Sequence, residues 1–156
     1  MPSDEQDKAG VVAPPPLIYL GTLIFGLLLA RRFPISFLPR KMARGLGLPL
    51  LGGGVLLLGW FERAMRQADT PASPYKPVER IAKEGPFRYS RNPGYLSMAM
   101  IYAGIASLAN ALWAILLLPV ALLAIRRGVI EREERYLERK FGEEYLSYKA
   151  QVRRWI

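Results

Sequence analysis

The chain has 156 residues, of which 51% are hydrophobic and 22% charged, and its formal net charge is +9 at pH 7. It contains no cysteine and no histidine, which excludes disulfides, thiol nucleophiles, Cys/His metal sites and catalysis by an imidazole base. The charges lie beside long uncharged segments, as in membrane proteins that contact anionic lipid head groups, and no recognised nucleic-acid-binding motif accompanies them.

The first apolar segment, 17–30, predicts a retained membrane span, because the acidic residues before it lack the basic start of a cleavable signal peptide. A second apolar segment follows at 46–61, and its run of glycines favours close packing against a neighbouring helix. The connector between these segments is basic and contains Arg40, Lys41 and Arg44. We expect it to form a short turn at a membrane interface.

A polar connector rich in proline is expected from Glu62 to Asn92, and it is too long for a simple turn. Its end is dense in aromatic and basic residues, which favours an ordered segment. Asn92 and Pro93 are typical of the N-cap and the first residue of a helix. The apolar stretch Gly94–Ile125 has Asn110 near its middle, so it predicts a tight hairpin of two short helices.

The helix that ends this hairpin is expected to continue beyond Ile125 and to leave the membrane. Residues 126–141 are good helix formers apart from Gly128, and Gly142 is placed to end the helix. A second short helix, Glu143–Gln151, is then expected to lie along the interface with tyrosines as anchors.

A projection at about 100° per residue places Ile130, Glu134, Leu137 and Phe141 in one stripe of this helix, with Arg127 at its edge. Two interpretations of the carboxylate stay open. It forms an ordinary surface pair with a neighbouring Lys or Arg, or it reaches with Arg127 into a site against the segment 88–95. The arginines of that segment are likewise either interfacial cations or site residues.

The sequence therefore predicts an all-α integral membrane protein with about four transmembrane helices in two hairpins, a long C-terminal helix extending into the cytoplasm and a short interfacial helix. Residues 1–62 form the two-span region and residues 63–156 the second module. The N-terminal segment, the long connector and the tail carry one, seven and nine Lys and Arg residues, against five in the first connector. The positive-inside rule places the first three in the cytoplasm, although the basic first connector opposes this orientation.

Three motifs of the second half occur in a specific order around the hairpin. They are Gly85–Leu96, with Arg91-Asn92-Pro93 near its end, then Glu133-Glu134-x-x-Leu137, then Phe141–Tyr148 followed by Val152. This order resembles the isoprenylcysteine carboxyl methyltransferase family, including its bacterial short forms and its phospholipid methyltransferase relatives. The resemblance covers about residues 75–156.

The resemblance implies that S-adenosylmethionine binds at the cytoplasmic side, in a site formed by the loop, the start of the hairpin and the long helix. Many members of the family have histidine where this chain has Asn92, so a base is lost at this position. The candidate catalytic residues are Glu134, Arg91 and Arg127. The candidate cofactor-binding residues are Arg88, Tyr89, Arg91, Asn92, Tyr95, Leu96, Glu133, Glu134, Tyr145 and Tyr148.

The implied reaction is methyl transfer to a lipophilic or small acceptor, and it requires neither histidine nor a metal. A carboxylate or thiolate acceptor would be oriented by Arg91 or Arg127, whereas an amine would need a base, for which Glu134 is the candidate. We expect the acceptor and membrane lipids as partners and the inner (plasma) membrane of a bacterium as the location. The alternatives are an NADPH-dependent membrane reductase related to sterol reductases and a non-catalytic lipid-binding module.

Overall fold

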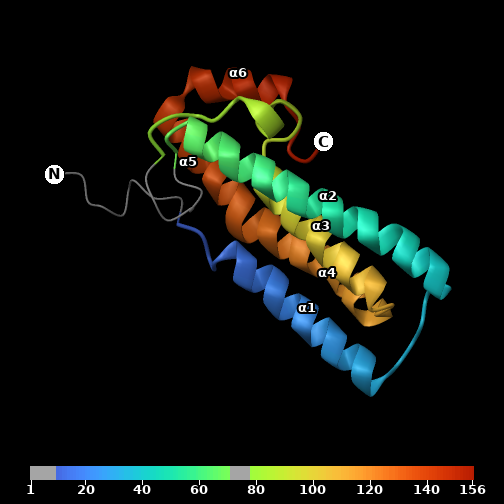
Figure 1. Ribbon diagram of the computed structural model, residues 1–156. Helices are drawn as coiled ribbons and strands as arrows, with labels where there is room; N and C mark the ends of the chain where they lie inside the picture. The colour runs from blue at the N-terminus through green and yellow to red at the C-terminus, as the bar shows by residue number, and fades with distance from the viewer. Residues whose placement is uncertain (1–9, 71–77) are drawn as a thin grey trace.

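Four long helices run side by side in the computed structural model, which describes residues 10–70 and 78–156 (Figure 1). All regular elements in these ranges are helices. Helices α1, α2, α3 and α4 alternate in direction, so both hairpins predicted from the sequence are present. Their bounds are α1 Pro15–Arg32, α2 Arg40–Gln67, α3 Pro93–Leu108 and α4 Leu112–Ile125.

The remaining elements gather at one end of the bundle (Figure 1). From α4 the chain continues through a π-helical stretch into α5, and α6 then turns back across the end of the bundle beside the short 3-10 helix η1. The long and the short helix after the hairpin are thus confirmed as structural elements. Their bounds are η1 Gly85–Arg88, η2 Arg126–Ile130, α5 Glu131–Phe141 and α6 Glu143–Gln151.

Glycines allow the helices to approach closely. A Cβ atom built on Gly54 of α2 would lie 2.8 Å from a side-chain carbon of Ile101 in α3, and one on Gly26 of α1 would lie 2.5 Å from the backbone of Ala114 in α4. Close packing is therefore confirmed for Gly54. Gly52 has no neighbour within 4 Å of its Cβ position, so the glycine run does not pack as a whole.

Asn110 forms the turn of the second hairpin, as expected, and fastens it to the connector of the first. Its backbone has φ +50°, a left-handed conformation that Asn tolerates better than most residues. Its side-chain oxygen accepts hydrogen bonds from the backbone N–H groups of Phe37 and Leu38, both at 3.2 Å, and its Nδ2 donates to the carbonyl of Leu38 at 2.8 Å. The end of the bundle opposite α6 is thereby held together.

Helix α2 is longer at both ends than the sequence suggested. The basic residues Arg40, Lys41 and Arg44 belong to its first turns and not to the connector, and the helix continues to Gln67. Long side chains keep their charge in water while their aliphatic stems lie along the helix, and Glu62–Gln67 are good helix formers. The connector to α3 therefore begins at Ala68, and α2 crosses position 62 without interruption.

Two helices of the described ranges are long and apolar enough to cross a membrane, by length and composition: Arg40–Gln67 and the continuous helix Leu112–Phe141. Helix α3 is apolar but shorter. About four spans were expected, so the prediction is met in part. The most apolar windows of the two long helices are only 17% and 28% buried, which leaves large outward-facing apolar surfaces of the kind that lipid covers.

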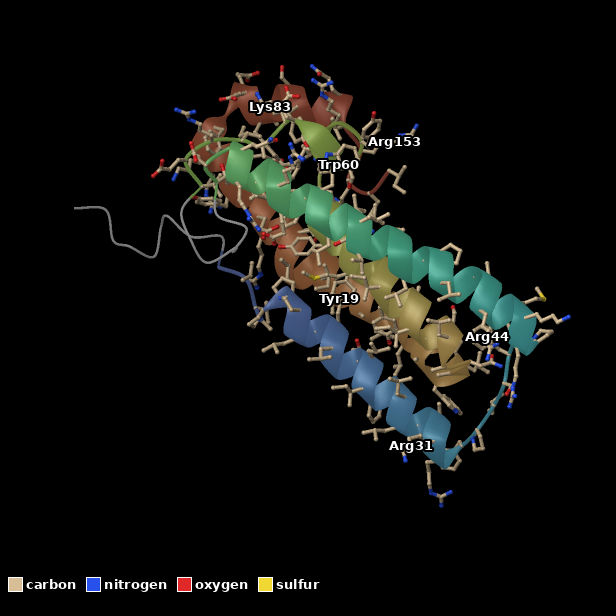
Figure 2. All side chains as sticks on the ribbon, in the orientation of Figure 1. Tyr19, Arg31, Arg44, Trp60, Lys83 and Arg153 are labelled. Carbon is tan, nitrogen blue, oxygen red and sulfur yellow. The ribbon has the colours of Figure 1, made fainter. Side chains whose placement is uncertain are left out.

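Charged side chains gather at the two ends of the bundle, while its flanks carry mostly carbon (Figure 2). Arg31 and Arg44 lie at one end, and Lys83 and Arg153 at the other. Eight of the eleven residues of α5 are charged, so the apolar part of the long helix Leu112–Phe141 ends near Ile125. Helices α5 and α6 therefore lie outside the apolar region.

Candidate active site

A cavity of about 500 Å³ lies at the end of the bundle that carries α5 and α6. Its walls come from the start of α1, the end of α2, the loop before η1, the segment Arg91–Tyr95, and helices α5 and α6. Most of its surface is apolar, and its volume is within the range of pockets that bind cofactors and other small ligands. The candidate residues that line it are Arg91, Asn92, Tyr95, Glu133, Glu134, Tyr145 and Tyr148.

Two guanidinium groups hold the carboxylate of Glu134. Arg154 donates from Nε to Oε1 at 3.0 Å and from Nη2 to Oε2 at 2.7 Å, so this ion pair is bidentate. Nη2 of Arg91 lies 3.4 Å from Oε1. Only 8% of the Glu134 side chain is exposed, so these interactions are weakly screened by water. The negative charge of Glu134 is therefore balanced by two cations and is not available as a free base.

The apolar stripe of the long helix begins at Ile130, the last residue of the π-helical stretch, and continues along α5. Ile130 and Glu134 are buried, and Leu137 and Phe141 pack against the cluster formed with Phe87. Arg127, predicted at the edge of this stripe, is exposed and does not line the cavity. A π-helical turn contains an extra residue, so the residues before it are rotated by about 100° relative to those after it. Arg127 lies inside this stretch, where the regular projection no longer holds, and its side chain is exposed away from the site.

Glu133 differs from its neighbour in having a hydroxyl partner in place of cations. Tyr95 donates a hydrogen bond to Oε1 of Glu133 at 2.7 Å, and Tyr19 donates to the backbone carbonyl of Tyr95 at 3.1 Å. Burial raises the pKa of Glu133 to about 7, the hydrogen bond from Tyr95 opposes this shift, and the negative charge of Glu134 adds to it. The two adjacent carboxyl groups therefore differ in their partners, and only that of Glu133 has its pKa raised toward neutrality by burial, a pattern found where acid–base roles are divided.

Asn92 directly precedes Pro93, the first residue of α3, as predicted, but its side chain forms no cap to the helix. Its Nδ2 instead donates to the backbone carbonyl of Arg154 at 2.9 Å. The hydroxyl of Ser90 donates to the same carbonyl at 3.4 Å, and the N–H of Arg91 donates to the carbonyl of Arg153 at 3.0 Å. The loop before α3 is therefore held to the C-terminal tail by three hydrogen bonds, and the Asn92 side chain takes part in these instead of capping the helix.

Arg91 has unused hydrogen-bonding capacity inside the cavity wall. Its side chain is only 9% exposed, yet Nε and Nη1 have no hydrogen-bond partner among residues 10–70 and 78–156. Buried guanidinium groups normally find partners for all their N–H groups. These two free donors therefore point to a ligand.

Tyr145 and Tyr148 of α6 contact each other at a ring distance of 6.2 Å and close one side of the site. Burial raises the pKa of Tyr145 to about 12, with the charge of Glu134 acting in the same direction and Arg91 opposing it. Burial likewise raises the pKa of Tyr148, whose hydroxyl donates to the carbonyl of Phe87 at 2.8 Å. Both hydroxyls are therefore neutral at physiological pH and serve as hydrogen-bonding and packing groups.

Three candidate cofactor-binding residues do not line the cavity. Arg88 is exposed and pairs with Glu84 at 2.6 Å, because η1 turns Phe87 inward and the following side chain outward. Tyr89 is 67% exposed and lies beside Trp60, with ring centroids 6.2 Å apart. Leu96 follows Tyr95 on α3, and one helical residue of rotation takes it out of the cavity wall.

Arg154 is the site residue that sequence reasoning missed. It lies twenty residues from Glu134 along the chain, outside any helical spacing that would suggest a pair. In the sequence the tail is one of several basic segments, and no periodicity distinguishes Arg154 from the adjacent Arg153. Only the return of α6 across the end of the bundle brings it to the carboxylate.

Comparisons with known proteins match this arrangement to one family. The family model described as phospholipid methyltransferase matches residues 42–144, from the start of α2 to the start of α6. A protein of Haemophilus influenzae, described as uncharacterized, is 48% identical over 63 residues, which are 40% of this chain and 98% of that protein. No solved structure matches the chain. The chain therefore belongs to the phospholipid methyltransferase family, the membrane methyltransferases that include the isoprenylcysteine carboxyl methyltransferase-like enzymes.

Proposed function

We propose that the protein is an integral membrane enzyme that transfers a methyl group from S-adenosylmethionine to a lipophilic or small acceptor. The observation that carries this proposal is the cavity beside the Arg91–Tyr95 segment, in which two carboxyl groups with different partners and a buried arginine with unpaired donors face one space. These groups fit the cofactor, because its amino-acid part has a carboxylate and its sulfonium is a cation. The apolar remainder of the wall suits a nucleoside and a lipophilic acceptor.

The bound cofactor would supply an activated methyl group on a positive sulfur. The residues of the chain have to align the acceptor with it and keep water away, which is the main requirement for an in-line displacement. Ionised Glu133 attracts the positive charge into the cavity, and Tyr95 fixes the orientation of this carboxylate through its hydrogen bond at 2.7 Å. The apolar side chains of α2 and η1 exclude water.

The acceptor is a carboxylate, a thiol or an amine. An amine acceptor needs a proton acceptor, and Glu133 is better suited to this role than Glu134, which was the candidate from the sequence. Glu134 is held by two cations, whereas Glu133 has a pKa of about 7 and accepts a hydrogen bond from one hydroxyl. The reductase and lipid-binding alternatives gain no support from the family to which the chain belongs.

We place α1 to α4 across the membrane as four spans, with the cavity end in the cytoplasm. At about 1.5 Å per residue, the 16 residues of α3 and the 14 of α4 measure roughly 24 and 21 Å, so the bilayer around this hairpin has to be locally thin. The excess of Lys and Arg at the cavity end supports the orientation. The bacterial inner membrane is the proposed location.

The direct test is ligand binding by the full chain in nanodiscs, followed by isothermal titration calorimetry. S-adenosylmethionine and S-adenosylhomocysteine should both bind, and NADPH should not. Glu133→Gln should weaken S-adenosylmethionine more than S-adenosylhomocysteine, because only the former carries the sulfonium charge. Absence of binding by both compounds, or tight binding of NADPH alone, contradicts the proposal.

A second experiment identifies the acceptor. Lipid extracts and small-molecule pools would be incubated with the protein in nanodiscs and with cofactor carrying an isotopically labelled methyl group. Mass spectrometry should then find one labelled class of compound, whose functional group is carboxylate, thiol or amine. The exposed Arg127→Ala variant is a control, since this side chain does not line the cavity.

A further inference from the structure

The carboxylate of Glu134 faces two guanidinium groups, and a second carboxylate, that of Glu131, lies 4.0 Å from Nη1 of Arg154. Arg91 and Arg154 both lie beside the Glu134 carboxylate, and the shorter, bidentate contact belongs to Arg154. Arg91 approaches only through Nη2, at 3.4 Å, which leaves Nε and Nη1 without hydrogen-bond partners among the described residues. A buried arginine beside a carboxylate ordinarily forms a bidentate ion pair with it, with two parallel N–H···O hydrogen bonds. Here Arg154 already occupies both oxygens.

We propose that Arg154 is a positioning residue, which satisfies Glu134 so that the free N–H groups of Arg91 can bind an oxyanion of the ligand. This inference rests on the proposed methyl-transfer site, and it adds which chemical group of the ligand Arg91 binds. The oxyanion is a carboxylate or a phosphate, since both accept charge-assisted hydrogen bonds from guanidinium N–H groups. It belongs either to the amino-acid part of the cofactor or to the acceptor.

The tail is held in place independently of the Arg154 side chain. The backbone carbonyl of Arg154 accepts hydrogen bonds from Asn92 and Ser90, and that of Arg153 accepts one from the N–H of Arg91. These bonds survive a change of side chain at position 154. The neighbouring Arg153 side chain is exposed and points away from the bundle (Figure 2). Arg153→Ala therefore removes the same charge from the same segment and is a matched control.

Removal of the Arg154 side chain has a specific expected result. In Arg154→Ala, the carboxylate of Glu134 loses its bidentate partner and competes with the ligand for Arg91. The affinity for the oxyanion should fall about tenfold or more, which is the effect of losing one charge-assisted contact. In Arg154→Ala with Glu134→Gln, the competing charge is gone and the affinity should return. Arg153→Ala should bind like the unaltered protein.

Calorimetry with three probes separates the two sources of the oxyanion. S-adenosylhomocysteine carries the carboxylate of the cofactor, 5′-methylthioadenosine is the same nucleoside thioether without the amino-acid part, and dodecyl phosphate stands for an acidic amphiphilic acceptor. Arg91→Lys keeps the charge and removes the fork. If the cofactor is the source, this variant should lose about tenfold in affinity for S-adenosylhomocysteine and none for 5′-methylthioadenosine. If the acceptor is the source, the loss should appear with dodecyl phosphate.

The results also separate this inference from the proposed function. If the unaltered protein binds neither nucleoside, the proposed function is wrong. If S-adenosylhomocysteine binds but no probe responds to Arg91→Lys, the inference alone is overturned. It is also overturned if the double variant binds as weakly as Arg154→Ala, because Arg154 would then be only a structural support. Thermal unfolding of each variant in nanodiscs verifies that the fold is retained.

Discussion

Ionisation of Glu133 should make the affinity for S-adenosylmethionine depend on pH, and the affinity for analogues without the sulfonium charge should lack this contribution. Burial raises the pKa of Glu133 to about 7, so its carboxylate is mostly protonated at pH 6 and mostly ionised at pH 8. With this pKa the ionised fraction rises from roughly one tenth to roughly nine tenths across that interval. If sulfonium binding requires the ionised form, the affinity for S-adenosylmethionine should rise about tenfold from pH 6 to pH 8.

Calorimetry in nanodiscs at half-unit steps of pH measures this effect. S-adenosylhomocysteine carries no sulfonium charge, so the ratio of the two affinities isolates the contribution of Glu133. In Glu133→Gln the ratio should be independent of pH, and in Arg127→Ala it should follow the unaltered protein, because Arg127 is exposed and does not line the cavity. A constant ratio in the unaltered, folded protein would refute the assignment of the sulfonium to Glu133.

Three further predictions concern stability, each measured by unfolding in detergent or nanodiscs. Folding raises the pKa of the Glu133 carboxyl, and such a group destabilises the folded protein at pH values above the pKa that it has in the unfolded chain. Glu133→Gln should therefore stabilise the ligand-free protein at pH 8 by up to about 3 kcal/mol and have little effect at pH 4. Equal effects at pH 8 and pH 4 would contradict this prediction. Glu134→Ala leaves two guanidinium groups without their anion and should cost about 3–5 kcal/mol, whereas Arg153→Ala should cost less than about 0.5. Gly54→Val places atoms 2.8 Å from Ile101 and should cost at least about 1–3 kcal/mol, while Gly52→Ala, with open space, should be neutral or stabilising.

Much of the helical framework could be predicted because its signals are local. Asn92-Pro93, Asn110 and Gly142 each mark a helix boundary through backbone preferences that neighbouring residues hardly alter. The ends of α2 were harder to predict. Charged residues limit the apolar segment in the sequence, but they do not end the helix, because their aliphatic stems lie along it and the backbone stays helical.

The site residues that lie on one face of α5 could be predicted from helical periodicity. Glu134, Leu137 and Phe141 share a face because α5 is a regular α-helix. Arg127 does not share this face, because it lies in the π-helical stretch, whose extra residue could not be predicted from the local sequence. Arg154 depended on the path of the chain after Gly142, which is a tertiary property. A return of twenty residues across the end of a bundle has no periodic signal in the sequence.

The π-helical stretch has a second consequence at the mouth of the cavity. Its altered bonding leaves the carbonyl of Gly128 to accept a hydrogen bond from the N–H of Val12 at 3.1 Å. Val12 lies two residues before Pro14–Pro16, which line the same cavity as Glu133. Deletion of Gly128 would restore an α-helical phase, turn the carboxylates by about 100° and release the chain before α1. The π-helical stretch thus sets the direction in which α5 presents Glu133 and Glu134, and it also holds the segment before α1 in place.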